Sequence, residues 1–237
     1  MEAEHIVSSY DEELRELNDM IARMGGLTES QIARAIEALV DRNPDLAESV
    51  VVDDERVDDL NYEIDEKATV LIALRQPMGL DLRNIVSALK IAADLERIAD
   101  YGANIARRSL ALSEVAPVRP MHAIPRMSQQ VQQMIKEVLD AYIERNVDKA
   151  MAVWASDREV DDMYTSLFRE LLTYMMEDPR SITPCTHLLF IAKHIERIGD
   201  HVTNIAEIIH YLVEGTRMRG ARPRGSTADH EVGSDAG

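Results

Sequence analysis

The sequence contains little cysteine, few aromatic residues and little glycine or proline. Its 237 residues include a single cysteine, Cys185, which excludes an intrachain disulfide and fits a reducing compartment. Only two Phe and one Trp occur among many Ala, Leu, Ile, Val and Met, together with 10 Gly and 8 Pro. This composition is typical of a helical protein, and 46% hydrophobic residues are enough to form a sizeable core.

Basic residues are also few compared with acidic ones. The chain has 26 Lys and Arg against 43 Asp and Glu, which gives a formal net charge of −17. Because this charge repels phosphate groups and anionic membranes, we expect no nucleic-acid partner and favour cations or basic protein surfaces. No apolar run approaches the roughly 20 residues of a membrane-spanning helix, and the acidic N-terminus does not look like a signal peptide. We therefore expect a cytoplasmic protein with no direct membrane span.

Helical periodicity extends from about residue 5 to about residue 214, and no alternating strand pattern persists beyond a few residues. Breaks with proline or asparagine divide this stretch into six expected helices. The breaks lie at Asn43-Pro44, Gln76-Pro77, Pro117 to Pro125, Asn146 to Asp148, and Pro179 with Thr183-Pro184. The six helices form two groups of three, on either side of the segment 113–125.

The two groups carry the same polar patterns. A Glu-x-x-x-Asp-x-x-x-Asn stripe occurs in the third and the sixth expected helix, and an Asp-x-x-x-Asp pair occurs in the second and the fifth. Duplication of a three-helix unit explains both matches. We therefore predict an all-α fold of two tandem three-helix bundles, residues 1–115 and 116–214. The stretch 215–237 has almost no apolar residues and is expected to be a disordered tail.

The stripe on the third helix consists of Glu96, Asp100 and Asn104. Because residues four apart are rotated by about 40° on a helix, these three lie within an arc of about 80°, whereas Ile91 and Leu95 mark the opposite side as core. Two acids one turn apart repel each other, and partial burial raises that cost, so we expect a cation to neutralise them. Carboxylate and amide oxygens suit hard and borderline metal ions.

Other interpretations remain open. The acids could form a solvated face neutralised by Arg97 or Arg197. Because both patterns recur, a common functional role of the two copies is about as well supported as this solvated face. A carboxylate-bridged di-metal enzyme is an alternative, because Glu207-x-x-His210 matches half of the usual motif, but the first half has no counterpart. A structural scaffold is a third. His187, His194 and His201 recur every seven residues and are favoured as structural, and Gly25-Gly26 predicts a kink or a close helix contact.

Together these patterns resemble the PhoU family of accessory proteins of the phosphate-specific transport system. The resemblance rests on the paired stripes, the paired aspartates, the turn from Leu74 to Pro77 and the sequence Asp81-Leu82-Arg83, and covers about residues 5 to 214. It implies two three-helix bundles, a cytoplasmic location and a homodimer. It also implies negative regulation of the phosphate-starvation response, through the ATPase of the phosphate ABC transporter and a sensor histidine kinase. The expected function is a metal-binding adaptor and not an enzyme.

In metal-binding members of this family, multinuclear iron or zinc clusters lie at the acidic motifs. The resemblance implies ligands at Asp54, Asp58, Glu96 and Asp100 in the first half and at Asp157, Asp161, Glu196 and Asp200 in the second, with Asn104 and Asn204 completing the stripes. The first half has Ala99 and Tyr101 where the second has Gly199 and His201. We therefore expect the two sites to be unequal.

Overall fold

The computed structural model of the chain describes residues 2–115 and 123–218, and in these two stretches all regular structure is helical. The first half contains α1 (Glu2–Val40), α2 (Pro44–Asp53), α3 (Glu55–Arg75) and α4 (Leu80–Ser113). The second contains α5 (Ala123–Glu144), α6 (Val147–Glu177), the short 3₁₀ helix η2 (Pro179–Ser181) and α7 (Ile182–Glu214). The all-α prediction is confirmed.

Side-chain caps mark the starts of α2 and α6. The side chain of Asn43 accepts the backbone N–H of Leu46 at the start of α2, and Asn146 does the same for Lys149 at the start of α6. Both are N-caps, which satisfy backbone donors that have no partner inside the helix. Gln76 ends α3 in the left-handed conformation, with φ of 48°. These boundaries fall where the sequence predicts them.

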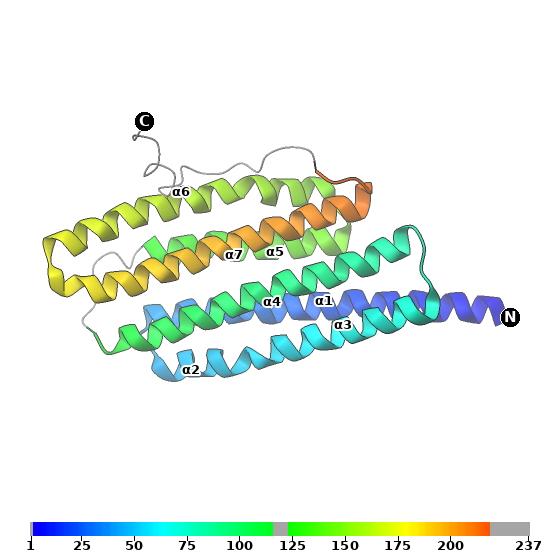
Figure 1. Cartoon of the computed structure of the whole chain (residues 1–237), viewed down its shortest axis with the longest axis horizontal. Helices are drawn as coiled ribbons and strands as arrows, with labels where there is room; N and C mark the ends of the chain where they lie inside the picture. Colours follow the sequence, from blue (N-terminus) through cyan, green and yellow to red (C-terminus); the bar gives the residue numbers. More distant parts are fainter. Residues whose placement is uncertain (1, 116–122, 219–237) are drawn as a thin grey trace, which may run out of the picture.

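The second expected helix is in fact divided at Asp54. Here the N–H of Val57 bonds the carbonyl of Asp54, three residues back, at 2.9 Å, which is the tighter 3₁₀ pattern. The dihedral angles of Asp54 stay helical, with φ of −55° and ψ of −39°, so α2 and α3 continue in nearly the same direction (Figure 1). Counting them as one interrupted helix leaves the predicted three-plus-three arrangement.

The long helices lie lengthwise, and α4 of the first half lies beside α7 of the second (Figure 1). Ile91, Leu95 and Ile98 on α4 are fully buried, which confirms the predicted core side of this helix. Their counterparts on α7, Ile191, Ile195 and Ile198, are also fully buried. Burial of each such side chain contributes about 1.5–3 kcal/mol.

A close helix contact occurs at the paired glycines of α1. The helix continues unbroken through Gly25 and Gly26, so a kink is not what the glycines provide. A Cβ atom on Gly25 would lie 2.5 Å from Cδ2 of Leu139 on α5, closer than carbon atoms can pack. The absence of a side chain therefore lets α1 and α5 approach each other.

The predicted domain boundary at 115/116 adjoins residues outside the described stretches. α4 ends at Ser113 and α5 begins at Ala123, on either side of residues 116–122. Of the predicted tail, residues 215–218 are described and residues 219–237 lie outside the described part of the chain. None of the described helices is long and apolar enough to cross a membrane.

Candidate functional site

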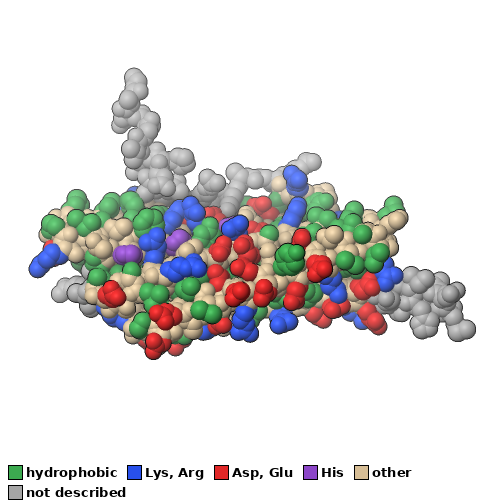
Figure 2. All heavy atoms as spheres, turned by 60° about the horizontal axis from the view of Figure 1, so that its bottom comes forward, with side chains coloured by type: hydrophobic (Ala, Val, Ile, Leu, Met, Phe, Trp, Pro, Cys, Tyr) green, Lys and Arg blue, Asp and Glu red, His purple; other side chains and the backbone are tan. Residues whose placement is uncertain are grey.

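The structure brings four predicted acids of the first half together where α2 meets α3 beside α4. This first acidic cluster consists of Asp54, Asp58, Glu96 and Asp100. Asp54 is only 8% exposed, whereas the other three are partly or largely exposed to solvent. Acidic side chains gather in the middle of one long face of the molecule (Figure 2).

Burial and neighbouring carboxylates raise the pKa values of three acids of this cluster, Asp54, Asp58 and Glu96. Burial raises the pKa of Asp54 most, and the charge of Asp100 adds to it. Burial also raises the pKa of Asp58, as do the charges of Asp54 and Asp100. For Glu96, burial and the charge of Asp100 raise the pKa, while Arg97 opposes them. The cluster therefore concentrates negative charge that the protein environment does not fully compensate.

Two neighbours compensate part of this charge. Arg97 lies 3.0 Å from Asp100 and 3.4 Å from Glu96. It therefore neutralises part of the stripe, as expected if these acids form a solvated face paired with arginine. Gln31 on α1 donates its side-chain N–H to Asp54 at 2.8 Å and to the carbonyl of Ala99 at 3.2 Å. Gln31 was missed by the sequence analysis, because α1 carries no acidic stripe that would point to it.

The second acidic cluster lies between α6 and α7 and is more deeply buried. It consists of Asp157, Asp161, Glu196 and Asp200, of which the first three are 1%, 8% and 7% exposed. Burial raises the pKa of Glu196 most, Lys193 opposes this, and the charges of Asp200 and Asp161 raise it further. Lys193 lies 2.8 Å from Glu196. This lysine was also missed, although its position three residues before Glu196 on the same helix is a visible signal.

The predicted inequality between the two sites has a structural basis at Ala99 and Gly199. A Cβ on Gly199 would lie only 2.8 Å from Oδ1 of Asp157 and 3.9 Å from Cγ1 of Val131 on α5. Asp157 therefore packs directly against the backbone of α7. In the first half, Gln31 lies between Asp54 and the backbone of Ala99 instead, which leaves room for the alanine methyl group.

The two asparagines of the stripes bind neighbours outside the clusters. The side-chain oxygen of Asn104 accepts a hydrogen bond from Arg107 at 3.0 Å. The side-chain N–H of Asn204 donates to Asp94 on α4 at 3.3 Å, across the interface between the halves. The structure thus gathers the eight acids in two groups of four, and both asparagines are engaged elsewhere.

The donor set of both clusters fits a hard or borderline cation. In the first, Oε1 of Gln31 is buried without a hydrogen-bond partner in the described chain, and in the second the same holds for Oε2 of Glu196. Each lies among carboxylates, so both clusters hold an acceptor that a cation would satisfy. Among the described residues, however, no three His, Cys, Asp or Glu side chains converge as ligands. Side chains would therefore have to turn toward an ion that binds here.

The remaining candidates have other roles. Nδ1 of His201 lies 2.7 Å from Asp94, and His194 stacks on Tyr101, so these histidines join the two halves. Burial lowers the pKa of His194 to about 4, which keeps this ring neutral. Of the motif considered for a di-metal enzyme, Glu207 accepts a hydrogen bond from Trp154, and His210 contacts the carbonyl of Thr216. These contacts do not favour the enzyme.

Known proteins similar to this chain identify its family. The model of the PhoU domain matches the chain twice, over residues 21–109 and 124–209. A "phosphate-specific transport system accessory protein PhoU homolog" from Caulobacter vibrioides is 53% identical over 222 residues, which cover 93% of this chain and 96% of that protein. A protein of the same name from Rhizobium meliloti is 51% identical, with 93% of each chain covered.

Solved structures agree. The crystal structure of PhoU from Pseudomonas aeruginosa matches with a TM-score of 0.85 and 40% identity, covering 87% of this chain and all of that one. The phosphate transport system regulatory protein PhoU from Streptococcus pneumoniae matches with a TM-score of 0.83 and 29% identity, covering 89% of this chain and 99% of that one. The two domain matches coincide with the two halves and their acidic clusters. This chain therefore belongs to the PhoU family.

Proposed function

We propose that this protein regulates phosphate uptake and the phosphate-starvation response as an accessory protein of the phosphate-specific transport system. One observation carries the proposal: relatives with that name are 51–53% identical to it over more than nine tenths of both chains. Such coverage includes both halves and both acidic clusters.

The mechanism we propose is that of an adaptor. Its partners are the ATPase of the phosphate ABC transporter and a sensor histidine kinase, and it acts in the cytoplasm as a homodimer. The net charge of −17 and the acidic face support contact with basic protein surfaces, because complementary charge accelerates and orients association. The two halves offer two related surfaces for such contacts.

We further propose that each cluster binds metal, with iron or zinc as the first candidates. The ligands would come from the four acids of each cluster. Gln31 and Glu196 support this proposal, since each places a buried acceptor without a hydrogen-bond partner in the described chain among carboxylates that repel one another. A bound cation would remove this repulsion.

The regulatory role is tested in the protein's own host. Deletion of the gene should raise the activity of a phosphate-starvation reporter in phosphate-rich medium, and the native gene should restore repression. A pull-down of the transporter ATPase and of the kinase tests the adaptor. An unchanged reporter after deletion would contradict the regulatory role, and failure to bind both partners, with and without phosphate, would contradict the adaptor mechanism.

Metal binding is tested by elemental analysis of protein purified without a metal-affinity column. We expect iron or zinc to copurify with the native protein and to be lost from the Asp100→Ala/Asp200→Ala double variant. Glu170→Gln is a suitable control, since Glu170 is an exposed acid of α6 that belongs to neither cluster. Equal metal content in native protein and double variant would contradict the assignment of these ligands.

A further inference from the structure

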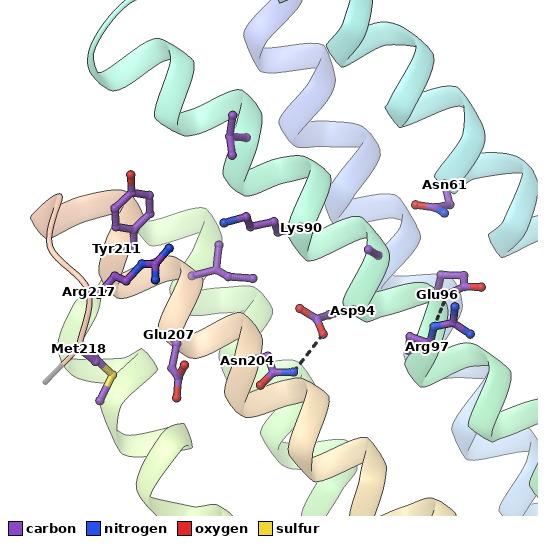
Figure 3. Close-up of a pocket in the computed structure, with 13 residues that line it drawn as sticks. Asn61, Lys90, Asp94, Glu96, Arg97, Asn204, Glu207, Tyr211, Arg217 and Met218 are labelled. Atoms are coloured by element: carbon purple, nitrogen blue, oxygen red, sulfur yellow. Dashed lines mark hydrogen bonds and ion pairs between the residues drawn. The ribbon is translucent and has the colours of Figure 1, made fainter. Parts of the chain in front are cut away.

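Two grooves on this molecule differ in how their charges are balanced. The larger, of about 830 Å³, lies between α4 and α7 (Figure 3). Its three carboxylates all have partners in the described chain, in the pairs Glu96–Arg97, Asp94–Asn204 and Glu207–Trp154. This groove therefore presents no unpaired acid to a basic partner.

The smaller groove, of about 320 Å³, lies between α1 and α3 and is partly apolar. Met20 lines it from α1, and Val70, Leu71 and Leu74 line it from α3. Leu71 is buried in the core, whereas Val70 and Leu74 are 48% and 75% exposed. Because Val70 and Leu74 are one helical turn apart, they form an apolar strip along α3 that faces solvent.

The smaller groove also carries more acidic than basic side chains. Its two basic residues are engaged with acids of α1, in the ion pairs Arg75–Glu13, at 2.7 Å, and Lys67–Glu16. Glu63 and Glu66, the other two acids of the lining, are exposed and form no ion pair with any residue in the described part of the chain. The lining therefore keeps two negative charges that a partner can neutralise.

The duplicated helix α6 shows which of these positions the bundle itself requires. In the register that aligns Asp54 with Asp157, the core residues Ile64 and Ala68 correspond to Leu167 and Leu171, and all four are buried. The groove positions are not retained, since Glu63, Glu66, Val70 and Leu74 correspond to Ser166, Arg169, Thr173 and Glu177. Packing of the three-helix unit thus accounts for the shared core positions, but not for the acidic and apolar strip on α3.

We propose that the groove between α1 and α3 is a docking site for a basic amphipathic helix of a partner protein. The apolar face of the partner helix covers Val70 and Leu74, and its basic residues pair with Glu63 and Glu66. The proposal rests on the adaptor function proposed above and assigns one docking surface to it.

The shape and length of the groove fit a helix. Its walls are two helices, and amphipathic helices bind in such grooves through apolar residues spaced three or four apart. Glu63 and Leu74 are separated by eleven positions, which corresponds to about 16 Å along α3. About three turns of a partner helix therefore span the strip.

A labelled peptide of about 18 residues, made of leucine and lysine with its leucines on one helical face, is a suitable probe. We expect it to bind the native full-length protein more tightly than a peptide of the same composition in scrambled order. Val70→Ser together with Leu74→Ser should weaken its binding at least about fivefold, because both changes remove apolar contact area. Leu172→Ser together with Met176→Ser is the matched control and should leave the affinity nearly unchanged, since these residues of α6 are 40% and 79% exposed and lie outside the groove.

The acidic side of the groove is tested by Glu63→Gln together with Glu66→Gln. We expect about twofold to fivefold weaker peptide binding, and a smaller loss at high salt. Glu159→Gln together with Glu170→Gln removes the same charge from exposed positions of α6, so it separates local pairing from the net charge of the protein. Circular dichroism checks that all four variants keep their helices.

Several results would overturn the proposal. They are equal affinity of the native protein and the serine variant of α3, equal losses from the two pairs of glutamine substitutions, and equal binding of the amphipathic and the scrambled peptide. Conversion of a native dimer into a monomer by Val70→Ser with Leu74→Ser would place a second copy of this chain in the groove, and would overturn it as well.

The pull-down with the transporter ATPase and the kinase separates this proposal from the adaptor function. We expect the native protein to capture these partners and the serine variant of α3 to lose at least one of them. Capture of both by the variant would contradict the groove alone. Capture of neither by the native protein would contradict the adaptor function, and the peptide measurements would then decide for or against the groove.

Discussion

Asp54 is a charged side chain that the fold buries at a cost. Burial and the charge of Asp100 raise its pKa, so the folded protein holds the proton more tightly than the unfolded chain. The contribution of Asp54 to the stability of the fold is therefore least favourable at pH values above its folded pKa. It becomes more favourable as pH falls through the folded pKa toward the ordinary aspartate pKa of 3.8. A cation bound nearby would reverse this effect.

Replacing Asp54 by Asn should therefore stabilise the metal-free protein at pH 7.5. The asparagine oxygen still accepts the hydrogen bond from Gln31, while the charge is removed. We expect the free energy of unfolding to rise by a few tenths to about 1 kcal/mol, and the gain to shrink as pH falls toward 4. Urea unfolding of chelator-treated proteins at both pH values measures this. A loss of stability at pH 7.5 without metal would show that the charge is already compensated.

The packing of the second cluster depends on the absence of a side chain at Gly199. Gly199→Ala would place Cβ 2.8 Å from Oδ1 of Asp157, so this buried carboxylate would have to shift. We expect a loss of about 1–3 kcal/mol in the free energy of unfolding, measured by urea denaturation. The reciprocal Ala99→Gly should cost only about 1 kcal/mol, from helix propensity. Equal losses would mean that Asp157 moves aside freely.

The acids of the site could be predicted from the sequence, whereas their partners could be predicted only in part. Spacing of four residues on a helix places side chains on one face, and duplication shows which faces correspond. Lys193 follows from the same rule. Gln31 could not be predicted in this way, because its contact with Asp54 depends on how α1 packs on α4. The hydrogen bond from Asn204 to Asp94 could not be predicted either, because it depends on how the two halves pack together.

At the level of the helices, the sequence predicts ends better than interruptions. Asn43 and Asn146 leave a signal because capping needs a short side-chain acceptor followed by a helical run. The division at Asp54 leaves none, since its dihedral angles remain helical and the N–H of Val57 bonds a carbonyl three residues back. A single change from an α to a 3₁₀ hydrogen bond hardly alters the spacing of apolar residues, so it cannot be detected in the sequence.

The neighbouring glycines of α1 allow the packing of α1 on α5 to be tested within one helix. A Cβ on Gly25 would meet the side chain of Leu139 at 2.5 Å, whereas a Cβ on Gly26 meets nothing within 4 Å. Gly26→Ala should therefore stabilise the protein by up to about 1 kcal/mol through helix propensity. Gly25→Ala should be about 1–3 kcal/mol less stable than Gly26→Ala because of overpacking.

Thermal or urea unfolding of both variants, followed by circular dichroism, measures this difference. Helix propensity contributes equally to the two substitutions, so the difference reports the contact alone. If Gly25→Ala were as stable as Gly26→Ala, Leu139 would be free to rotate away, and the close approach of the helices would not require a glycine.

On the scale of the whole molecule, polar and aromatic contacts join the two halves along α4 and α7. Asp94 contacts His201, Tyr101 stacks on His194, and further along Arg108 lies 4.1 Å from the centre of the Phe190 ring. On α4 these residues are seven apart, and on α7 their partners are seven and then four apart in the opposite direction, as expected for an antiparallel helix pair. Because these contacts between α4 and α7 join both halves along the two helices, we expect the halves to unfold together.

Two arginines related by the duplication test how the halves are joined. Arg42 and Arg145 both precede a helix-capping asparagine and both have a left-handed backbone, with φ of 52° and 53°. Arg42 donates to carbonyls at the end of α4 within its own half. Arg145 instead crosses to the other half, where it donates to Asn84 at 2.8 Å and to Asn18 at 3.4 Å.

Substitution by glycine suits both backbones and removes both guanidinium groups, so the two variants differ mainly in the bonds that are lost. We expect Arg145→Gly to lower the free energy of unfolding by about 1–3 kcal/mol, because Asn84 loses a charged partner in a partly buried interface. Arg42→Gly should cost less, since water can reach the carbonyls at a helix end, whereas the relief of the left-handed backbone by glycine is the same in both variants. In both variants, Trp154 fluorescence and circular dichroism should report one shared urea transition, because the seam between α4 and α7 remains. A fluorescence transition that precedes the loss of helix in Arg145→Gly would mean that the second half unfolds separately and that this single arginine couples the two repeats.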